Sequence, residues 1–496
     1  MKLLQHIFSK LDKNESSYSF GLFRILFHAH WLWLLVDIYP IRDLLFDSVS
    51  PWQRVDIPMD MLIFFSAFFS FLMMIGMLTK YVSVVNYILF VIITFSNINF
   101  HTASFYDDLL KIGSLGCIFL PVARSFSVDA MLSKNTNQQT WKLNYTLLLF
   151  ISLGLLYFGS AITKLYSPIW QKGIGLWMPM AVPSNNITDF SIYIADHILF
   201  LKLLSGIVII WEFTFIFCLF FPSTYLVISI FGILFHVGIA ALFPFPKISL
   251  GPLMFYTLLI PEKFWLKIKS IVSIFKNHLP AQQPSPSVLT YTQRKQLFIS
   301  FAVFLLIMQL FVSGYKFYYK GYEKEKQFKR LSKQSKEGYR FSLKPSKAIR
   351  TFWGINGRGL FLDQSFTGTK NTYAIVYKNK LGNWDWLPYF NYRGMPGEYN
   401  QNMAWAKNTF QLISLPANGF NENGLKLFTA FWARKNNLSL DSLHFRVLFK
   451  ETTYPTEYEP KCRQKLEHQP WKTHGYITWY KEQFSYIQLD TNWLRK

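Results

Sequence analysis

Lys164 is the residue of this chain whose type and position most clearly permit chemistry. It ends an apolar run, 147–162, in the string Ala-Ile-Thr-Lys-Leu-Tyr-Ser-Pro-Ile-Trp-Gln-Lys-Gly. A charged ammonium is costly at the edge of hydrocarbon, because the low dielectric penalises an ion. Two interpretations follow. The side chain extends to the membrane interface as an anchor, or the amine gives up its proton readily and acts as a base.

Two histidines and a glutamate are further polar residues where chemistry could occur. His101 follows the third apolar stretch, whereas Glu212 and His236 lie inside apolar stretches. A buried imidazole or carboxyl group needs a partner. Glu212 could orient His236, or it could hold two helices together. Each group also has a structural interpretation, since a loop histidine is often only solvated and a lysine at a helix end is often an anchor.

Nine apolar stretches must position these groups, most of them near the roughly 20 residues that cross a bilayer as a helix. The sequence therefore predicts a polytopic α-helical membrane protein. The amphipathic segment 174–196 is expected in the membrane interface, and Trp170 and Trp177 fit an interfacial aromatic belt. The nine stretches are 20–39, 60–78, 81–98, 108–123, 144–163, 198–220, 222–241, 248–261 and 297–314.

The composition supports the same class of protein. Of the 496 residues, 51% are hydrophobic and 19% aromatic, and the mean hydropathy is +0.18. A net charge of +23 first suggests nucleic-acid binding, but the lysines are spread along the chain without an Arg-rich tract or zinc-ligand spacing. Contact with anionic membrane lipid is the simpler interpretation, and no nucleic-acid partner is expected. The three cysteines have no metal-site spacing and predict no disulfide framework.

Basic residues in the short loops predict the orientation. More of them lie on the side of the N-terminus, which indicates a cytoplasmic N-terminus in an inner (plasma) membrane. Nine spans then place the tail outside, in the periplasm or extracellular space. His101, Lys164 and His236 meet at the outer side under this topology. Three titratable groups on three segments at one depth could form a site at the mouth of a helical bundle.

Three regions are predicted along the chain. Residues 1–314 form the transmembrane domain with a cytoplasmic loop at 262–296, 315–339 form a charged connecting helix, and 340–496 form a strand-rich α+β extracytoplasmic domain. Within the tail, alternating apolar residues and a hairpin signal predict strands, and spacing by three and four predicts one helix. The strands are expected at 372–377, 384–390, 444–450 and 476–480, and the helix at 425–435.

Several strings, in their order and spacing, resemble the vitamin K-dependent γ-glutamyl carboxylase family. Its membrane portion is also called the horizontally transferred transmembrane (HTTM) domain, and the similarity covers roughly residues 15–265. The strings are Gly-Leu-Phe-Arg-Ile-Leu-Phe, Asn-Phe-His-Thr-Ala-Ser-Phe, Phe-Ser-Val-Asp-Ala-Met-Leu, Thr-Lys-Leu followed by Trp-Gln-Lys-Gly, and Phe-His followed by Pro-Leu-Met-Phe-Tyr-Thr-Leu-Leu.

The resemblance implies an enzyme of the carbon–carbon lyase class. Its cofactor is a reduced vitamin K, a menaquinol-type hydroquinone, used with oxygen and carbon dioxide and without a metal. Lys164 matches the lysine that deprotonates the hydroquinone, and His101 matches a histidine tied to epoxidation. His236 matches another histidine of the family, in a proton-transfer or carbanion-supporting role. Epoxide formation then drives carboxylation of glutamate in an exported peptide or protein. Further candidates for quinone binding are Trp170, Asp108 and Glu212.

The chain also departs from that family. Thr163 precedes Lys164 where the family has a second lysine, and the cysteines cannot reproduce the disulfide of the animal enzymes. The tail contains no recognisable propeptide-binding sequence. The alternative is therefore a non-catalytic membrane partner in the maturation or export of a secreted peptide. A transporter is disfavoured, since no inverted repeat is visible.

Overall fold

The computed structural model describes most of the helical region and most of the tail, and every statement below refers to those residues. The described ranges are 14–15, 17–46, 58–96, 105–132, 141–142, 144–243, 246–261, 264–265, 267, 303–304, 307–308, 368–400, 413–414 and 422–489. His101, the connecting segment 315–339 and nearly all of loop 262–296 lie outside them.

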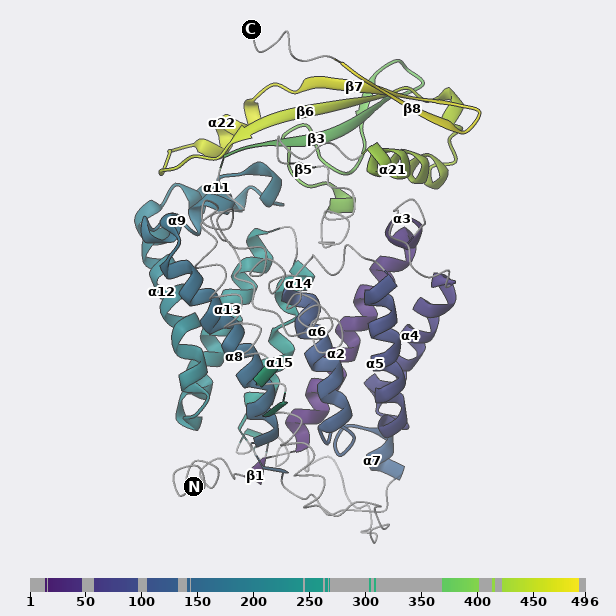
Figure 1. The fold of residues 1–496 in the computed structure, drawn as a ribbon. Coiled ribbons are helices and arrows are strands. Elements are labelled where there is room, and N and C mark those ends of the chain that lie inside the picture. Colours follow the sequence, from purple (N-terminus) through teal and green to yellow (C-terminus); the bar gives the residue numbers. More distant parts are fainter. Residues whose placement is uncertain are drawn as a thin grey trace, which may run out of the picture.

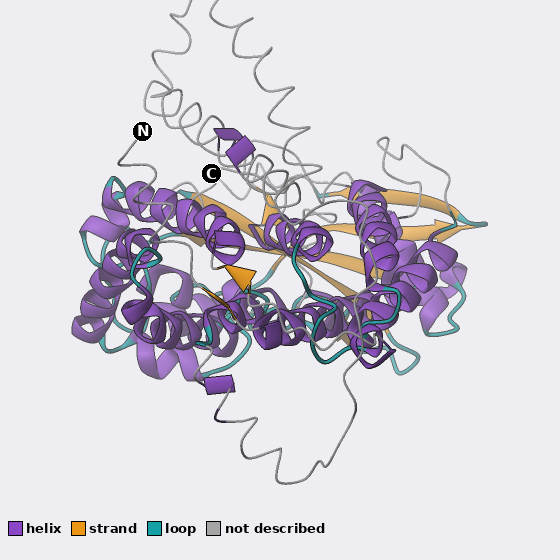
Figure 2. Cartoon of the chain, turned by 90° about the horizontal axis from the view of Figure 1, so that it is seen from below, coloured by secondary structure: helices purple, strands orange, loops and turns teal. Residues whose placement is uncertain are grey.

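Long apolar helices standing side by side form the first part of the chain (Figures 1 and 2). Seven of them coincide with predicted stretches to within a few residues, and each turns an aromatic or aliphatic side into the bundle. Three segments are long and apolar enough to cross a membrane, 18–44, 198–218 and 225–242. The seven helices are α2 (Ser17–Ile38), α4 (Met59–Ile75), α5 (Thr79–Ser96), α6 (Phe105–Phe119), α8 (Asn144–Leu165), α12 (Ile198–Cys218) and α13 (Tyr225–Leu242).

The predicted span at 248–261 is wrong. The chain there forms three short pieces, α14 (Pro246–Leu250), α15 (Leu253–Tyr256) and the 3-10 turn η5 (Thr257–Leu259). Pro252 follows Gly251 at the break, and proline cannot donate the hydrogen bond that would continue α14. The predicted span at 297–314 is described only at four helical residues, so the count of nine spans is not confirmed.

Arg24, in α2, links three segments of the bundle through hydrogen bonds. Its side chain is fully buried, and its guanidinium donates to the carbonyls of Met73 at 2.7 Å and Phe126 at 2.5 Å. These carbonyls belong to the end of α4 and to the segment that precedes α7 (Val128–Leu132). The guanidinium approaches so closely that a Cβ on Gly76 would lie 2.0 Å from its Nη1.

Substituting Gly76 with alanine is expected to destabilise the protein by at least about 1–2 kcal/mol. Gly76 ends α4 with a φ of +73°, a conformation that strains an L side chain, and the new methyl group would displace Arg24. Gly206→Ala is the matched control, because it lies inside α12 with open space around the added Cβ. Thermal melting in detergent should show a lower Tm for Gly76→Ala alone; equal melting of both variants would contradict this.

The segment 174–196 folds into short pieces that pack in part against the tail. It contains α10 (Trp177–Met180), η3 (Pro183–Asn185) and α11 (Phe190–Ala195). Trp177 is 1% exposed and packs edge-on against Tyr458, with ring centroids 5.3 Å apart. Trp177 therefore belongs to an internal contact and not to an aromatic belt at the lipid headgroups.

The tail is an antiparallel sheet with one long helix packed on a face. The strand order is β4-β3-β6-β7-β8, and β5 (Ile413–Ser414) pairs with β3. Helix α21 (Glu422–Lys435) lies between the sheet and the helical bundle (Figure 1). Trp432 of α21 packs 4.4 Å from the ring of Tyr377, which fixes this face as the core. The strands are β3 (Thr369–Lys378), β4 (Trp384–Trp386), β6 (Phe445–Thr453), β7 (Lys472–Tyr480) and β8 (Gln483–Gln488).

The strand-rich part of the prediction is confirmed, with different bounds for the expected strands and with additional elements. The hairpin forms where expected, and Asn379 accepts from the amides of Leu381 and Asn383 to close its turn. The strand predicted at 384–390 ends at Trp386. Both β8 and helix α22 (Cys462–His468) were missed. All three cysteines have free thiols.

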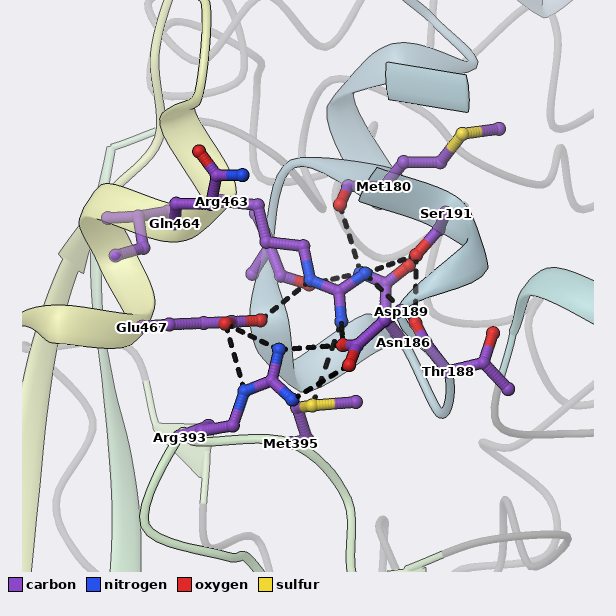
Figure 3. A network of polar contacts seen from close by, with 12 residues as sticks. Met180, Asn186, Thr188, Asp189, Ser191, Arg393, Met395, Arg463, Gln464 and Glu467 are labelled. Atoms are coloured by element: carbon purple, nitrogen blue, oxygen red, sulfur yellow. Dashed lines mark hydrogen bonds and ion pairs between the residues drawn. The ribbon is translucent and has the colours of Figure 1, made fainter. Parts of the chain in front are cut away.

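A network of two arginines and two carboxylates joins the tail to the helical region (Figure 3). Arg393 donates to Asp189 at 2.6 Å and to Glu467 at 2.7 Å. Arg463, which is 2% exposed, donates to the other oxygen of Glu467 at 2.8 Å and also bonds Ser191. Asp189 and Ser191 belong to the segment before α12, so the network fixes the sheet over one end of the helical bundle.

Acidification is expected to loosen this contact. The hydrogen bond from Arg393 holds the pKa of Asp189 below its ordinary value near 4. The stabilisation is therefore present above that ordinary value and is lost as the pH falls through the lower, folded value. Melting curves between pH 3 and 7 should show that the Tm of the wild type decreases at the acidic end. This decrease in Tm should be smaller in Asp189→Asn. Asp441→Asn, at an exposed position, should behave like the wild type, and identical curves for Asp189→Asn would contradict the argument.

Candidate functional site

Lys164 ends in a buried polar cluster between α8 and α12. Its side chain is 2% exposed, so it does not extend into solvent as an anchor would. The Nζ atom forms an ion pair with Oε1 of Glu212, which is 3% exposed, and donates to Oγ of Ser160 at 3.0 Å. The ring centroid of Trp170 lies 4.9 Å from the same nitrogen, within the range of a cation–π contact.

The local sequence explains why these groups meet. Ser160 lies four residues before Lys164, so both side chains share one face of α8. Helices α8 and α12 pack along their lengths with opposite chain directions. Gly154 permits their close approach, since a Cβ there would lie 3.1 Å from the side chain of Ile216. Trp170 arrives from α9 (Pro168–Gln171), the short helix that follows the turn at the end of α8.

A buried ion pair carries a high desolvation cost. Removing two charges from water costs several kcal/mol each, and their attraction repays this only with good geometry and further hydrogen bonds. Lys164 has such support from Ser160 and Trp170, but Oε2 of Glu212 has no hydrogen-bond partner among the described residues. The pair can exist as ammonium and carboxylate, or as amine and carboxylic acid, with one proton shared between them.

Three polar atoms of α12 are buried without a partner among the described residues. They are Oε2 of Glu212, Nε1 of Trp211 and Oγ of Ser205. Ser205 lies seven residues, or two turns, before Glu212, and therefore on the same side of the helix. Unpaired polar groups are costly inside a protein, and such groups often mark a site for water or a ligand. This helix offers two acceptors and two donors that the protein itself does not use.

His236 belongs to a second polar contact, which joins α13 to α8. Its Nε2 lies 2.7 Å from the hydroxyl of Tyr157, and both side chains are buried. Tyr157 packs on Trp211, with ring centroids 4.8 Å apart. Gly232 makes room on α13 for Tyr256, because a Cβ there would lie 2.1 Å from the Tyr256 hydroxyl. The result is an aromatic cluster with an imidazole and two phenols beside the Lys164 contact.

The structure brings some of the sequence-predicted residues together. Lys164, Glu212 and Trp170 form one cluster. The suggestion that Glu212 orients His236 is wrong, because Tyr157 bonds the imidazole and Glu212 bonds Lys164. Tyr157 lies seven residues before Lys164, about 10 Å along the helix, so the histidine contact is deeper than expected.

Two further candidates are not placed. His101 lies outside the described residues, so its proximity to Lys164 stays a prediction. Asp108 lies in α6, where the structure describes the backbone and not that side chain. Sequence reasoning also missed Ser160 and Tyr157, although their spacing of four and seven residues before Lys164 places both on its helix face.

One comparison with known proteins identifies a domain in this chain. Residues 21–265 match the sequence model of the HTTM domain. The matched range runs from within α2 to beyond η5 and contains both polar contacts described above. No curated protein and no solved structure matches the chain.

Proposed function

We propose that this membrane protein, which carries an HTTM domain over residues 21–265, is a vitamin K-dependent γ-carboxylase-like enzyme. It would couple oxidation of a reduced quinone to the epoxide with carboxylation, or a related modification, of glutamate in an exported protein. The observation that carries the proposal is the buried Lys164–Glu212 pair inside that domain. A lysine and a carboxyl group that share a proton, away from water, can act together as a general base.

The pair supplies both a base and a store for the proton. In the amine and carboxylic acid form, Nζ of Lys164 has a lone pair that can accept a proton from a substrate hydroxyl group. Glu212 already contacts Nζ through Oε1, and its second oxygen can pass a proton onward. Ser160 holds Nζ in place, and Trp170 covers it and limits access of water.

The unpaired polar atoms of α12 fit a hydroquinone. One of its hydroxyl groups would donate to Nζ of Lys164, the other could donate to Oγ of Ser205, and either could accept from Nε1 of Trp211. Trp170 and Trp211 provide aromatic surface for a fused ring. When bound, the reduced quinone would supply electrons and, with oxygen, the basicity needed to remove a γ-proton from glutamate, which carbon dioxide then carboxylates.

His236 and Tyr157 have a supporting role in this proposal. Their 2.7 Å hydrogen bond could relay a proton, because a proton taken up at one end while another is released at the other leaves both groups neutral. His101 is proposed as a further group at the outer side. The protein is proposed to lie in the inner (plasma) membrane, with its N-terminus in the cytoplasm and its tail in the periplasm or outside the cell.

The direct test is an activity assay with the purified protein. Reduced vitamin K, oxygen, labelled bicarbonate and Glu-containing peptides should yield quinone epoxide and labelled peptide. Epoxide without label would indicate a related modification of another acceptor. The absence of both products from folded protein would overturn the proposal.

A second candidate is a non-catalytic partner in the maturation or export of a secreted peptide. The observation that favours it is the same ion pair, because a buried Lys–Glu contact can simply hold α8 and α12 together. This candidate predicts that an apolar replacement of the pair preserves function, whereas deletion of the tail abolishes it. The carboxylase-like proposal predicts that an apolar replacement of Lys164 and Glu212 abolishes function.

A further inference from the structure

Arg446 occupies an unusual place on the tail sheet. It lies on the face opposite α21, here called the outer face. The strand register pairs Arg446 with Val376 on one side and with Tyr476 on the other, and Tyr476 with Ile487. Side chains at paired positions share a face, so these residues form a row across four strands. Tyr476 and Ile487 are exposed, by 37% and 56%.

Two aromatic rings flank the guanidinium. Its Cζ lies 4.2 Å from the ring centroid of Trp384 and 5.6 Å from that of Tyr476. Within the part of the chain that the structure describes, Arg446 has no ion pair, and its buried Nε has no hydrogen-bond partner. Arg393 and Arg463 differ in this respect, because each is bonded to carboxylates. The rings thus hold a planar cation whose hydrogen bonds the protein leaves unused.

The outer face has one sign of charge. Among its described strand positions, the charged side chains are Lys378, Arg446 and Lys450, and none is acidic. Lys450 already has a partner within the protein, since its Nζ donates to the backbone carbonyl of Glu467 at 3.0 Å. Lys378 is exposed at the end of β3. A partner for this face must therefore be negative, and Arg446 is where it would be bound most directly.

We propose that Arg446 anchors a binding site for an acidic peptide segment on the outer face. A guanidinium stacked between rings keeps its fork planar and presents an edge that suits two parallel hydrogen bonds to a carboxylate. The neighbouring surface is mixed, with the apolar Ile487 and the exposed hydroxyls of Thr478 and Ser485. This mixture suits a peptide with acidic, apolar and polar side chains better than a small inorganic anion.

The inference rests on the proposed function for the origin of the peptide, which would be the exported polypeptide. Binding itself requires no quinone chemistry and can be measured alone. The two hypotheses therefore fail separately. A Lys164→Ala protein should bind the peptide as the wild type does, even if it makes no epoxide.

The experiment measures peptide affinity for the full chain in nanodiscs of uncharged lipid. One probe alternates Glu with Leu and Ser, and its matched control has Gln in place of Glu. Calorimetry should give a Kd that is at least about tenfold tighter for the Glu peptide and that weakens with salt. Arg446→Gln should lose that advantage, whereas Arg434→Gln, at a 69%-exposed arginine on α21, should keep it. Thermal melting should confirm that both variants are folded.

Four results would overturn the inference. Equal affinity of Arg446→Gln and the wild type would show that this residue is not the anchor. Equal binding of the Glu and Gln peptides would show that no carboxylate is recognised. If inorganic phosphate or an acidic polysaccharide displaced the Glu peptide at equal concentration, the site would be a general anion site and not a peptide site. A wild-type protein that forms epoxide but does not bind the Glu peptide would overturn this inference and leave the proposed function intact.

Discussion

Replacing Lys164 with alanine is expected to lower quinone-epoxide formation by at least about 100-fold, the usual contribution of a positioned base. The side chain is buried, and its Nζ is held by Ser160 and Glu212 in a defined place. No other lysine is described within this cluster, so no neighbouring amine can replace it. Epoxide measured by chromatography, at equal amounts of folded protein, provides the readout.

Lys172→Ala is the matched control for this prediction. Lys172 lies eight residues farther along the chain, and its side chain is 49% exposed beside Glu457 of the tail. Its loss should change epoxide formation less than twofold, since exposed ion pairs contribute little. An equal decrease in both variants would point to a general effect of removing positive charge. Full activity of Lys164→Ala would exclude the role of base.

Substituting Glu212 with alanine is expected to destabilise the protein by about 3–5 kcal/mol, because it leaves an uncompensated charge at Lys164 in the bundle. The double variant Lys164→Met/Glu212→Leu should recover most of that stability, since apolar residues of similar size replace a costly ion pair. The free energy of coupling between the two positions follows from the four proteins of this cycle.

Thermal melting in one detergent at constant pH checks this second prediction. The Tm should fall clearly in Glu212→Ala and return toward the wild-type value in the double variant. Ser205→Ala is a suitable control, because Oγ of Ser205 has no hydrogen-bond partner among the described residues. If the decreases in Tm of the two single variants simply added up in the double variant, the two side chains would not stabilise each other as a buried ion pair.

The long apolar helices could be predicted well from the sequence, because the length and hydrophobicity of each apolar run favour them. Seven predicted stretches became helices with ends shifted by a few residues. The stretch at 248–261 failed because apolar composition does not distinguish a spanning helix from short pieces interrupted at Gly251-Pro252. The contact between segment 174–196 and the tail could not be foreseen, since an amphipathic pattern fits a protein surface as well as a membrane interface.

The site could be predicted only as a set of residues and not as a set of contacts. Lys164, His236 and Glu212 were conspicuous, because each is a costly polar group within apolar sequence. Their pairing depends on how α8, α12 and α13 are aligned, and that alignment comes from side-chain packing such as Gly154 against Ile216. The partner of His236 was missed because a tyrosine in an apolar helix costs little and attracts no notice.

In the tail, alternation of apolar residues predicted four of the strands, because one face of the sheet packs on α21. The arginine and carboxylate network that joins the tail to the helical region could not be foreseen. Asp189 and Glu467 are far apart in sequence and are ordinary surface residues by type. Only the folded arrangement brings them to Arg393 and Arg463.

The most direct measurement of the central claim is epoxide formation by the double variant Lys164→Met/Glu212→Leu. Because this variant is expected to remain folded, its activity separates chemistry from structural support. The carboxylase-like proposal predicts no epoxide from reduced vitamin K and oxygen, alongside a wild-type protein that produces it. Epoxide at the wild-type rate from the folded double variant would contradict the proposal and leave the pair as a structural contact between α8 and α12.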